Sequence, residues 1–173
     1  VQAGSISPEE ALLQMKLAPF EDLGYAKVDY HRAVRQGASE VIYGQSKTPE
    51  HIAGILEAMQ RRDSSNILVT RIEQKTADWL AERFPLRYEP LAKLAVVLPR
   101  PTEQRGAIAV ITGGTSDIGV AEEAAITAET LGNRVTRLYD VGVSGIHRLL
   151  SNSEVLMDAA VVIAIAGMEG ALA

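Results

Sequence analysis

Residues 107–119 read AIAVITGGTSDIG and decide the fold. Their first half is a nearly continuous apolar run, which is typical of a parallel strand buried on both faces. The glycine-rich turn Gly113–Asp117 ends this strand. The elements predicted after it are a helix, a strand, a short helix and a strand, over 120–131, 134–139, 143–150 and 159–166. This βαβαβ order predicts a parallel, Rossmann-like α/β sheet with right-handed crossovers.

The residues before this stretch predict a second α/β unit. A serine cap, a proline and a glutamate at 7–10 indicate the start of a helix over 8–18. Apolar spacing predicts two more helices and four strands, over 49–59 and 75–84 and over 25–29, 40–44, 66–70 and 91–98. The segment 99–106 is rich in proline and charge, as linkers are. We therefore expect an N-terminal α/β domain over 1–99 and a Rossmann-like domain over 106–173.

The predicted parallel sheet is thin. It has three strands, whereas open parallel sheets normally have more strands and covered faces. A further crossover helix would begin just after Gly167. We therefore expect the domain over 106–173 to be C-terminally incomplete, and the alternative is that an oligomer partner completes the sheet.

Composition excludes several classes of protein. The 173 residues carry a formal net charge of −5, which argues against non-specific nucleic-acid binding. They contain no cysteine, which excludes a thiol nucleophile or a thiolate metal site within them. No segment reaches the roughly 18 apolar residues of a membrane span, and 1–8 has no signal-peptide pattern. We expect a cytoplasmic protein that binds neither nucleic acid nor membrane.

Three glycine-rich loops follow the three predicted parallel strands, at Gly113–Asp117, Asp140–His147 and Gly167–Ala171. Ligands of open parallel sheets bind beyond the carboxyl ends of the strands. Glycine lets successive backbone N–H groups point at a phosphate, and a following helix N-terminus adds partial positive charge. One such loop could equally be a tight turn with a capping side chain. Three at consecutive strand ends favour a binding site.

Two sets of charged residues stand out as candidates for chemistry. Glu169 follows an apolar strand and lies beside Met168 between glycines, where a carboxylate could act as an acid or base. Its alternative is a first-turn glutamate stabilised by the helix dipole. Arg32 and Arg35 are one helical turn apart, and Lys47 precedes a helix cap, so all three could hold an anion. The alternative for these cations is a solvated basic surface.

A dehydrogenase is a weak hypothesis. Residues 112–119 resemble the T-G-x-x-x-G-x-G cofactor loop of short-chain dehydrogenases. The match fails at Asp117, where close approach of the pyrophosphate requires glycine. No Tyr-x-x-x-Lys pair follows the loop.

The same loops support a different resemblance. Residues 105–173 resemble the aminoimidazole ribonucleotide carboxylase superfamily, whose Gly-x-x-Ser-Asp signature is Gly113–Asp117 here. Ser144–Arg148 is similar to its Ser-Ala-His-Arg motif with one residue inserted. The third loop reads Gly-Met-Glu-Gly-Ala-Leu, which departs from the Gly-Gly-Ala-Ala-His of the purine enzymes.

Together with the N-terminal motifs, the chain resembles the LarB family of pyridinium carboxylase/hydrolases in nickel-pincer nucleotide biosynthesis. These motifs are at 29–32, 35–37, 40–44 and 47–48. The resemblance implies carboxylation of the pyridinium ring of nicotinic acid adenine dinucleotide. Hydrolysis of the phosphoanhydride then releases AMP and a pyridinium-3,5-dicarboxylate mononucleotide. It also implies a cysteine nucleophile downstream of the third loop, so we expect these 173 residues to be inactive alone.

The resemblance assigns roles to individual residues. It implies catalytic roles for Glu169 and Asp117, with Ser116 and Asp117 at the ribose or phosphates. The expected substrate-binding residues are Gly113, Gly114, Thr115, Ser116, Asp117, Gly142, Gly167, Met168, Arg32, Arg35 and Lys47. We expect CO₂ or bicarbonate as a substrate, no metal site, no tightly bound cofactor, and Mg²⁺ as an optional ion. The resemblance further implies a closed homo-oligomer, often an octamer.

Two alternatives stay open. One is a purine-type aminoimidazole ribonucleotide carboxylase or mutase. The other is a non-catalytic nucleotide-binding module.

Overall fold

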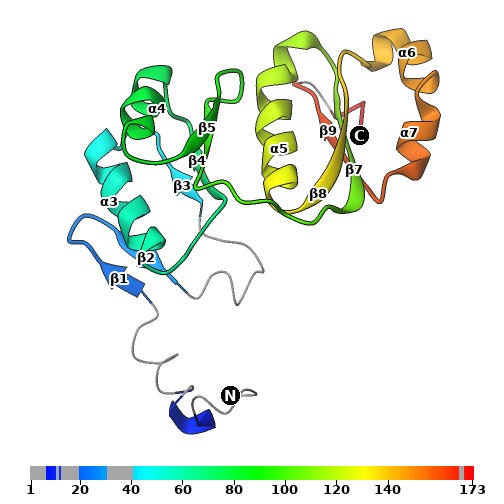
Figure 1. The fold of residues 1–173 in the computed structure, drawn as a ribbon. Coiled ribbons are helices and arrows are strands. Elements are labelled where there is room, and N and C mark those ends of the chain that lie inside the picture. The colour runs from blue at the N-terminus through cyan, green and yellow to red at the C-terminus, as the bar shows by residue number, and fades with distance from the viewer. Residues whose placement is uncertain (1–6, 11, 13–19, 31–40, 168–169) are drawn as a thin grey trace.

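The computed structural model describes residues 7–10, 12, 20–30, 41–167 and 170–173. These residues form a two-stranded hairpin, a four-stranded mixed sheet and a three-stranded parallel sheet (Figure 1). The prediction of an α/β protein is confirmed. The first predicted helix begins as expected, because the Glu10 N–H donates to Ser7 Oγ and the Ser7 N–H donates to the Glu10 carboxylate.

The hairpin consists of β1 (Phe20–Asp22) and β2 (Lys27–Asp29), which pair antiparallel. Its turn is closed by the Leu23 N–H, which donates to the Ala26 carbonyl at 2.8 Å. The strand predicted over 25–29 is therefore present as β2. β1 was not predicted, because the strand has only three residues, two of which are acidic, and so shows no apolar alternation.

The mixed sheet has the strand order β3-β4-β6-β5. Its strands are β3 (Ile42–Tyr43), β4 (Ile67–Thr70), β5 (Leu86–Glu89) and β6 (Leu94–Val97). β3 and β4 are parallel, joined by the crossover helix α3 (Pro49–Gln60), and the other pairs are antiparallel. The predicted helix over 75–84 is α4 (Gln74–Ala81). β5 was not predicted, because its alternation of apolar and charged residues extends over only four positions.

One face of the mixed sheet is covered by α3 and α4, which share a core with it. Thr48 caps α3 by accepting the His51 N–H at 3.3 Å, and Pro49 follows at the first helical position. Ile52 and Leu56, one turn apart on α3, are fully buried in this core. The predicted amphipathic helix is therefore confirmed.

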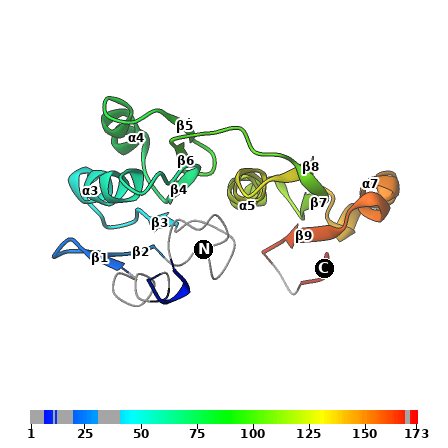
Figure 2. The same cartoon turned by 60° about the horizontal axis from the view of Figure 1, so that its bottom comes forward.

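The opposite face of the mixed sheet packs against α5 (Ile118–Thr130), which belongs to the parallel unit. Leu68, Leu94 and Val96 form an apolar cluster with Ile126 of this helix. On its other side, Ala121 and Ala125 pack against Val110 of the central parallel strand. The helix thus lies between two sheets (Figure 1, Figure 2), and its alanines allow that close approach.

The parallel sheet has the order β8-β7-β9. Its strands are β7 (Arg105–Thr112), β8 (Asn133–Leu138) and β9 (Val161–Ile165), in parallel as predicted. The loops carry two 3₁₀ turns, η1 (Thr115–Asp117) and η2 (Val143–Gly145). α6 (Ile146–Leu150) and α7 (Ser153–Asp158) pack on the face opposite α5. The six-residue α7 was not predicted, because its polar residues give little apolar periodicity.

The connection between the mixed and parallel sheets is held in place by Asn66. Its Oδ1 accepts the Arg100 N–H at 2.8 Å, and its Nδ2 donates to Thr102 Oγ1 at 3.0 Å. Arg100 also pairs with Asp63, with 2.5 Å between Nη2 and Oδ1. The proline-rich segment therefore runs along the protein surface in a fixed position, and β7 begins at Arg105.

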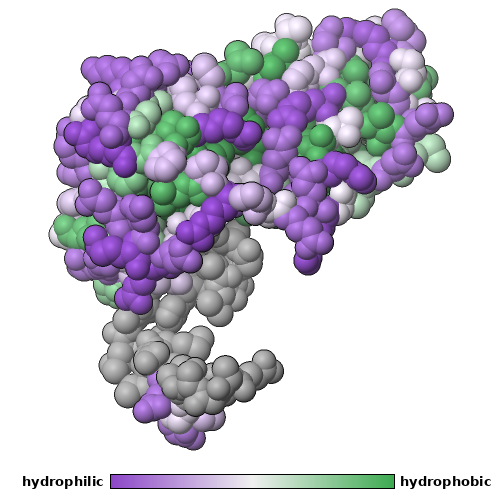
Figure 3. Space-filling model, in the orientation of Figure 1, coloured by the Kyte–Doolittle hydropathy of each residue, from purple (hydrophilic) through white to green (hydrophobic). Residues whose placement is uncertain are grey.

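Hydrophilic side chains cover much of the face shown in Figure 3, with apolar patches between them. Among the larger exposed apolar side chains are Leu150, Met157 and Val161. None of the helices in the described part of the chain is long and apolar enough to cross a membrane.

Candidate functional site at the carboxyl edge of the parallel sheet

The three predicted loops meet at the carboxyl edge of the parallel sheet. The first loop begins at Gly113, whose N–H donates to the Ile165 carbonyl at the end of β9, at 2.9 Å. On the other side, the Val141 N–H donates to the Thr112 carbonyl at 2.9 Å. The end of β7 is therefore hydrogen-bonded to the end of β9 on one side and to the loop after β8 on the other.

The first two loops approach each other so closely that a side chain does not fit at Gly142. A Cβ atom at Gly142 would lie 2.4 Å from the Gly113 carbonyl oxygen. A Cβ atom at Gly113 would lie 3.1 Å from Ala166 Cβ. Loop-to-loop packing thus requires glycine at Gly142, whereas a side chain at Gly113 would need a small shift of Ala166, and the sequence alone did not reveal either contact.

The first loop is closed by Asp117. Its Oδ2 accepts the Gly114 N–H at 3.1 Å, so this carboxylate caps the turn that leads into α5. Thr115 and Ser116 are exposed, and no hydrogen bond joins either hydroxyl to another of the described residues. The loop therefore presents two hydroxyl groups to solvent beside the half-buried start of a 13-residue helix.

The second loop starts at Asp140, which adopts a left-handed backbone conformation with φ of 57°. Its N–H donates to Thr112 Oγ1 at 2.9 Å, and its carboxylate accepts a hydrogen bond from Arg148. The sequence analysis placed Asp140 in the second loop and Arg148 in a motif, but it did not predict that the two side chains pair. The buried Thr112 was missed, because a threonine at the end of a β-strand has no distinctive sequence signal.

The third loop begins at Gly167, which is exposed, with nothing within 4 Å of where a Cβ would lie. Met168 and Glu169 lie outside the described residues, and so do Arg32 and Arg35. Their predicted roles remain predictions.

Lys47 lies in the loop after β3, where its Nζ donates to the Tyr43 carbonyl at 2.8 Å. No hydrogen bond or ion pair connects it to the three loops in the described part of the chain. The loop that contains Lys47 lies at the same end of the fold as the three glycine-rich loops. At that end Arg71, which follows β4, pairs with Glu123 of α5, with 3.5 Å between Nε and Oε2. At the opposite end, Asn66 before β4 contacts Thr102 before β7.

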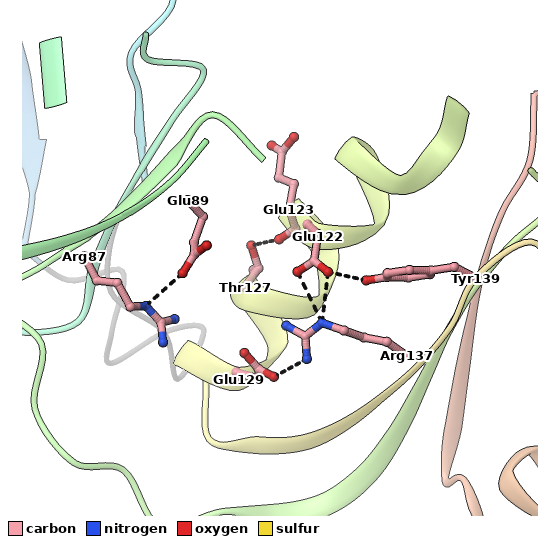
Figure 4. Close-up of polar contacts among 8 residues, drawn as sticks. All are labelled: Arg87, Glu89, Glu122, Glu123, Thr127, Glu129, Arg137 and Tyr139. Atoms are coloured by element: carbon pink, nitrogen blue, oxygen red, sulfur yellow. Dashed lines mark hydrogen bonds and ion pairs between the residues drawn. The ribbon is translucent and has the colours of Figure 1, made fainter. Parts of the chain in front are cut away.

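An ion-pair cluster ties α5 to β8 next to the second loop (Figure 4). Arg137 Nε lies 3.2 Å from Glu122 Oε2, and its Nη1 lies 2.5 Å from Glu129 Oε1. The Tyr139 hydroxyl, just before Asp140, donates to Glu122 Oε1 at 2.6 Å. Burial, together with the hydrogen bond to the Glu122 carboxylate, raises the pKa of Tyr139 to about 12. The cluster anchors the start of the second loop to the helix that follows the first.

Two other features bear on ligand binding. The described residues contain no group of three or more His, Asp or Glu side chains that could hold a metal ion. A pocket of about 230 Å³ opens near the beginning of β7, lined by residues that include Ala107, Arg134 and Asp158. It lies away from the three loops, at the start of the strands.

Comparisons with known proteins identify the family. Residues 20–99 match the model of the LarB/PurE-like N-terminal domain. The chain is also 35% identical, over 181 residues, to an uncharacterised protein of Methanocaldococcus jannaschii. That match covers 98% of this chain and 70% of the relative. The chain therefore belongs to the LarB/PurE-like family, a PurE-related family of carboxylase type.

Proposed function

We propose that the protein carboxylates the pyridinium ring of nicotinic acid adenine dinucleotide with CO₂ and hydrolyses the phosphoanhydride. The products are AMP and pyridinium-3,5-dicarboxylate mononucleotide. The observation that carries the proposal is the meeting of three glycine-rich loops at one sheet edge in a LarB/PurE-like chain. Such an edge is where open parallel sheets bind nucleotides.

The first loop is suited to the phosphates of this substrate. The N-terminus of α5 carries partial positive charge, and the hydroxyls of Thr115 and Ser116 are exposed beside it. The Asp117 carboxylate caps the loop through Oδ2, which leaves Oδ1 to accept a ribose hydroxyl. We assign the substrate's ribose-phosphate to this loop, with Gly142 and Gly167 flanking it. Lys47, Arg32 and Arg35 are the cations that we assign to its anionic groups.

The carboxylation step makes a carbon–carbon bond and releases a proton. A cationic ring cannot attack CO₂ until an added nucleophile supplies electron density. Glu169 is the carboxylate that we assign to receive the ring proton, with Asp117 as the second acid–base group. Hydrolysis then adds water across the phosphoanhydride. We assign no tightly bound cofactor, and Mg²⁺ is an optional ion that would offset the charge of the phosphates.

The proposal is tested with full-length protein, because these 173 residues contain no cysteine and the family resemblance implies a thiolate nucleophile. The protein is incubated with the dinucleotide and bicarbonate, with and without Mg²⁺. AMP is measured by chromatography, and the pyridinium product by mass spectrometry. We expect AMP together with a pyridinium product heavier by one CO₂. Formation of neither product would contradict the proposal.

The second candidate is a purine-type aminoimidazole ribonucleotide carboxylase or mutase. The observation in its favour is the Gly-x-x-Ser-Asp loop at Gly113–Asp117, which the purine enzymes share. Turnover of aminoimidazole ribonucleotide in the same assay would favour it. Binding of AMP without turnover of either substrate would instead favour a non-catalytic nucleotide-binding module.

The resemblance also supports a proposal about assembly. We assign a closed homo-oligomer, with the octamer as the expected size. Light scattering on the full-length protein tests this, and a monomer would contradict it.

A further inference from the structure

Thr112 places a hydroxyl where the fold alone requires only an apolar side chain. It is the last residue of the central strand β7, and its exposed fraction is 0%. The residues before it, Val110 and Ile111, are apolar and buried. Valine has nearly the same shape as threonine and would avoid burying a polar group. The hydroxyl therefore calls for a reason other than packing.

The reason lies in where the strand pairing stops. The register between β7 and β8 ends with Ile111 opposite Leu138, so Thr112 pairs with Ile165 of β9 but has no partner in β8. Beyond that point, Thr112 Oγ1 accepts the Asp140 N–H and the Thr112 carbonyl accepts the Val141 N–H, each at 2.9 Å. One residue thus supplies two acceptors at the start of the second loop, and Glu122 supplies a third by accepting the Tyr139 hydroxyl.

The same residue is directly bonded to the first loop, because Gly113 follows it in the chain. Gly113 in turn donates to the end of β9. A shift of Asp140 would also move Arg148, whose guanidinium is hydrogen-bonded to the Asp140 carboxylate. The Thr112 hydroxyl is therefore the side-chain contact that joins the Asp140 turn directly to the strand from which the first loop begins.

We infer that Thr112 is a positioning residue for the nucleotide site. Its hydroxyl holds the Asp140–Gly142 turn at the separation from the Gly113–Asp117 loop that a nucleotide spanning both loops requires. This inference rests on the proposed function. Thr112 acts through the two loops and has no assigned contact with the substrate.

The test compares two substitutions of the same residue. Thr112→Val removes the hydroxyl and keeps the shape, whereas Thr112→Ser keeps the hydroxyl. Thr130→Val is the matched control, because its hydroxyl donates to the Ile126 carbonyl at 2.7 Å near the far end of α5. Dissociation constants for nicotinic acid adenine dinucleotide and for AMP are measured by calorimetry. Hydrogen exchange at the Asp140 and Val141 amides is measured without ligand.

We expect Thr112→Val to weaken dinucleotide binding by up to about tenfold, because losing the Asp140 hydrogen bond lowers the fraction of protein whose second loop is in the binding position. Thr112→Ser and Thr130→Val should remain within about twofold of the wild type. Exchange at the Asp140 amide should accelerate in Thr112→Val alone. In the full-length enzyme, the loss should appear in KM more than in kcat, because misplaced loops weaken ground-state binding.

Three results would overturn the inference. The first is wild-type binding by Thr112→Val. The second is equal loss in Thr112→Ser, which would show that packing and not the hydroxyl matters. The third is unchanged exchange at Asp140, which remains measurable if binding is lost in every variant. If the wild-type protein binds neither the dinucleotide nor AMP, the proposed function fails, and the exchange measurement still decides whether Thr112 positions the second loop.

Discussion

Replacing Gly142 by alanine tests the contact that joins the first two loops. The new Cβ would lie 2.4 Å from the Gly113 carbonyl oxygen and 3.2 Å from its carbonyl carbon. Both are backbone atoms and cannot rotate aside as a flexible side chain would. The loops must therefore move apart, which strains the hydrogen bond from the Val141 N–H to the Thr112 carbonyl.

The size of the effect follows from this overlap. Forcing an extra carbon into a closely packed site costs about 1–3 kcal/mol. In a chain of this size, each kcal/mol lowers the melting temperature by about 2–4 °C. We therefore expect Gly142→Ala to lower the melting temperature by about 2–12 °C. Binding of the dinucleotide should weaken as well, because the same loops are assigned to hold it.

Thermal unfolding followed by circular dichroism measures the effect. Gly167→Ala serves as the stability control, because nothing lies within 4 Å of its Cβ position although Gly167 belongs to the same edge. We expect this control to melt within about 1 °C of the wild type. Equal melting temperatures for Gly142→Ala and Gly167→Ala would refute the close contact between the loops and the site geometry built on it.

Three further predictions concern the rest of the fold. The Tyr139 phenol should titrate near pH 12 by ultraviolet absorbance, and Glu122→Gln should lower that midpoint. Folding raises the pKa of Tyr139 from 10.0, so the stability that the protonated phenol contributes is complete below pH 10 and is lost as the pH rises towards 12. A midpoint unchanged by Glu122→Gln would contradict the hydrogen bond between Tyr139 and Glu122 as a cause of the raised pKa. Arg137→Met leaves Glu122 and Glu129 without their shared partner. This substitution should lower the free energy of unfolding, measured in urea, by about 1–2 kcal/mol, less than for a fully buried pair because the side chains are partly exposed. An unchanged free energy of unfolding would contradict a stabilising role for the ion-pair cluster. Thr48→Ala removes the cap of α3 and should cost about 1 kcal/mol, whereas Thr48→Ser should cost much less.

The sequence predicted the elements with strong local signals. The helix at Pro49–Gln60 has a cap, a proline and an apolar face, and the central parallel strand contains a long apolar run between two glycines. Those signals are set within a few residues, so a single sequence contains them. The short elements β1, β5 and α7 were missed, because each has too few residues to show a clear periodicity. β1 and β5 are stabilised by pairing with the strand that follows them, and α7 by packing on the parallel sheet.

The meeting of the three loops was predictable, because the carboxyl ends of adjacent parallel strands must lie at one edge. The individual contacts between the loops were not predictable. The contact between Gly142 and Gly113, and the bond from Asp140 to Thr112, join residues 28–29 positions apart through their three-dimensional placement. The packing of Ile126 against Leu68 likewise depends on which face of the mixed sheet α3 and α4 leave uncovered. No periodicity in the sequence encodes that choice.

Hydrogen exchange of the chain with and without nicotinic acid adenine dinucleotide tests the central claim most directly. The loops at the carboxyl edge are assigned to hold the nucleotide, so the dinucleotide should slow exchange at 113–117 and 140–145. Exchange around Ala107, Arg134 and Asp158, which line the pocket near the start of the strands, should not change. Protection of that pocket, or no protection at either loop, would contradict the account.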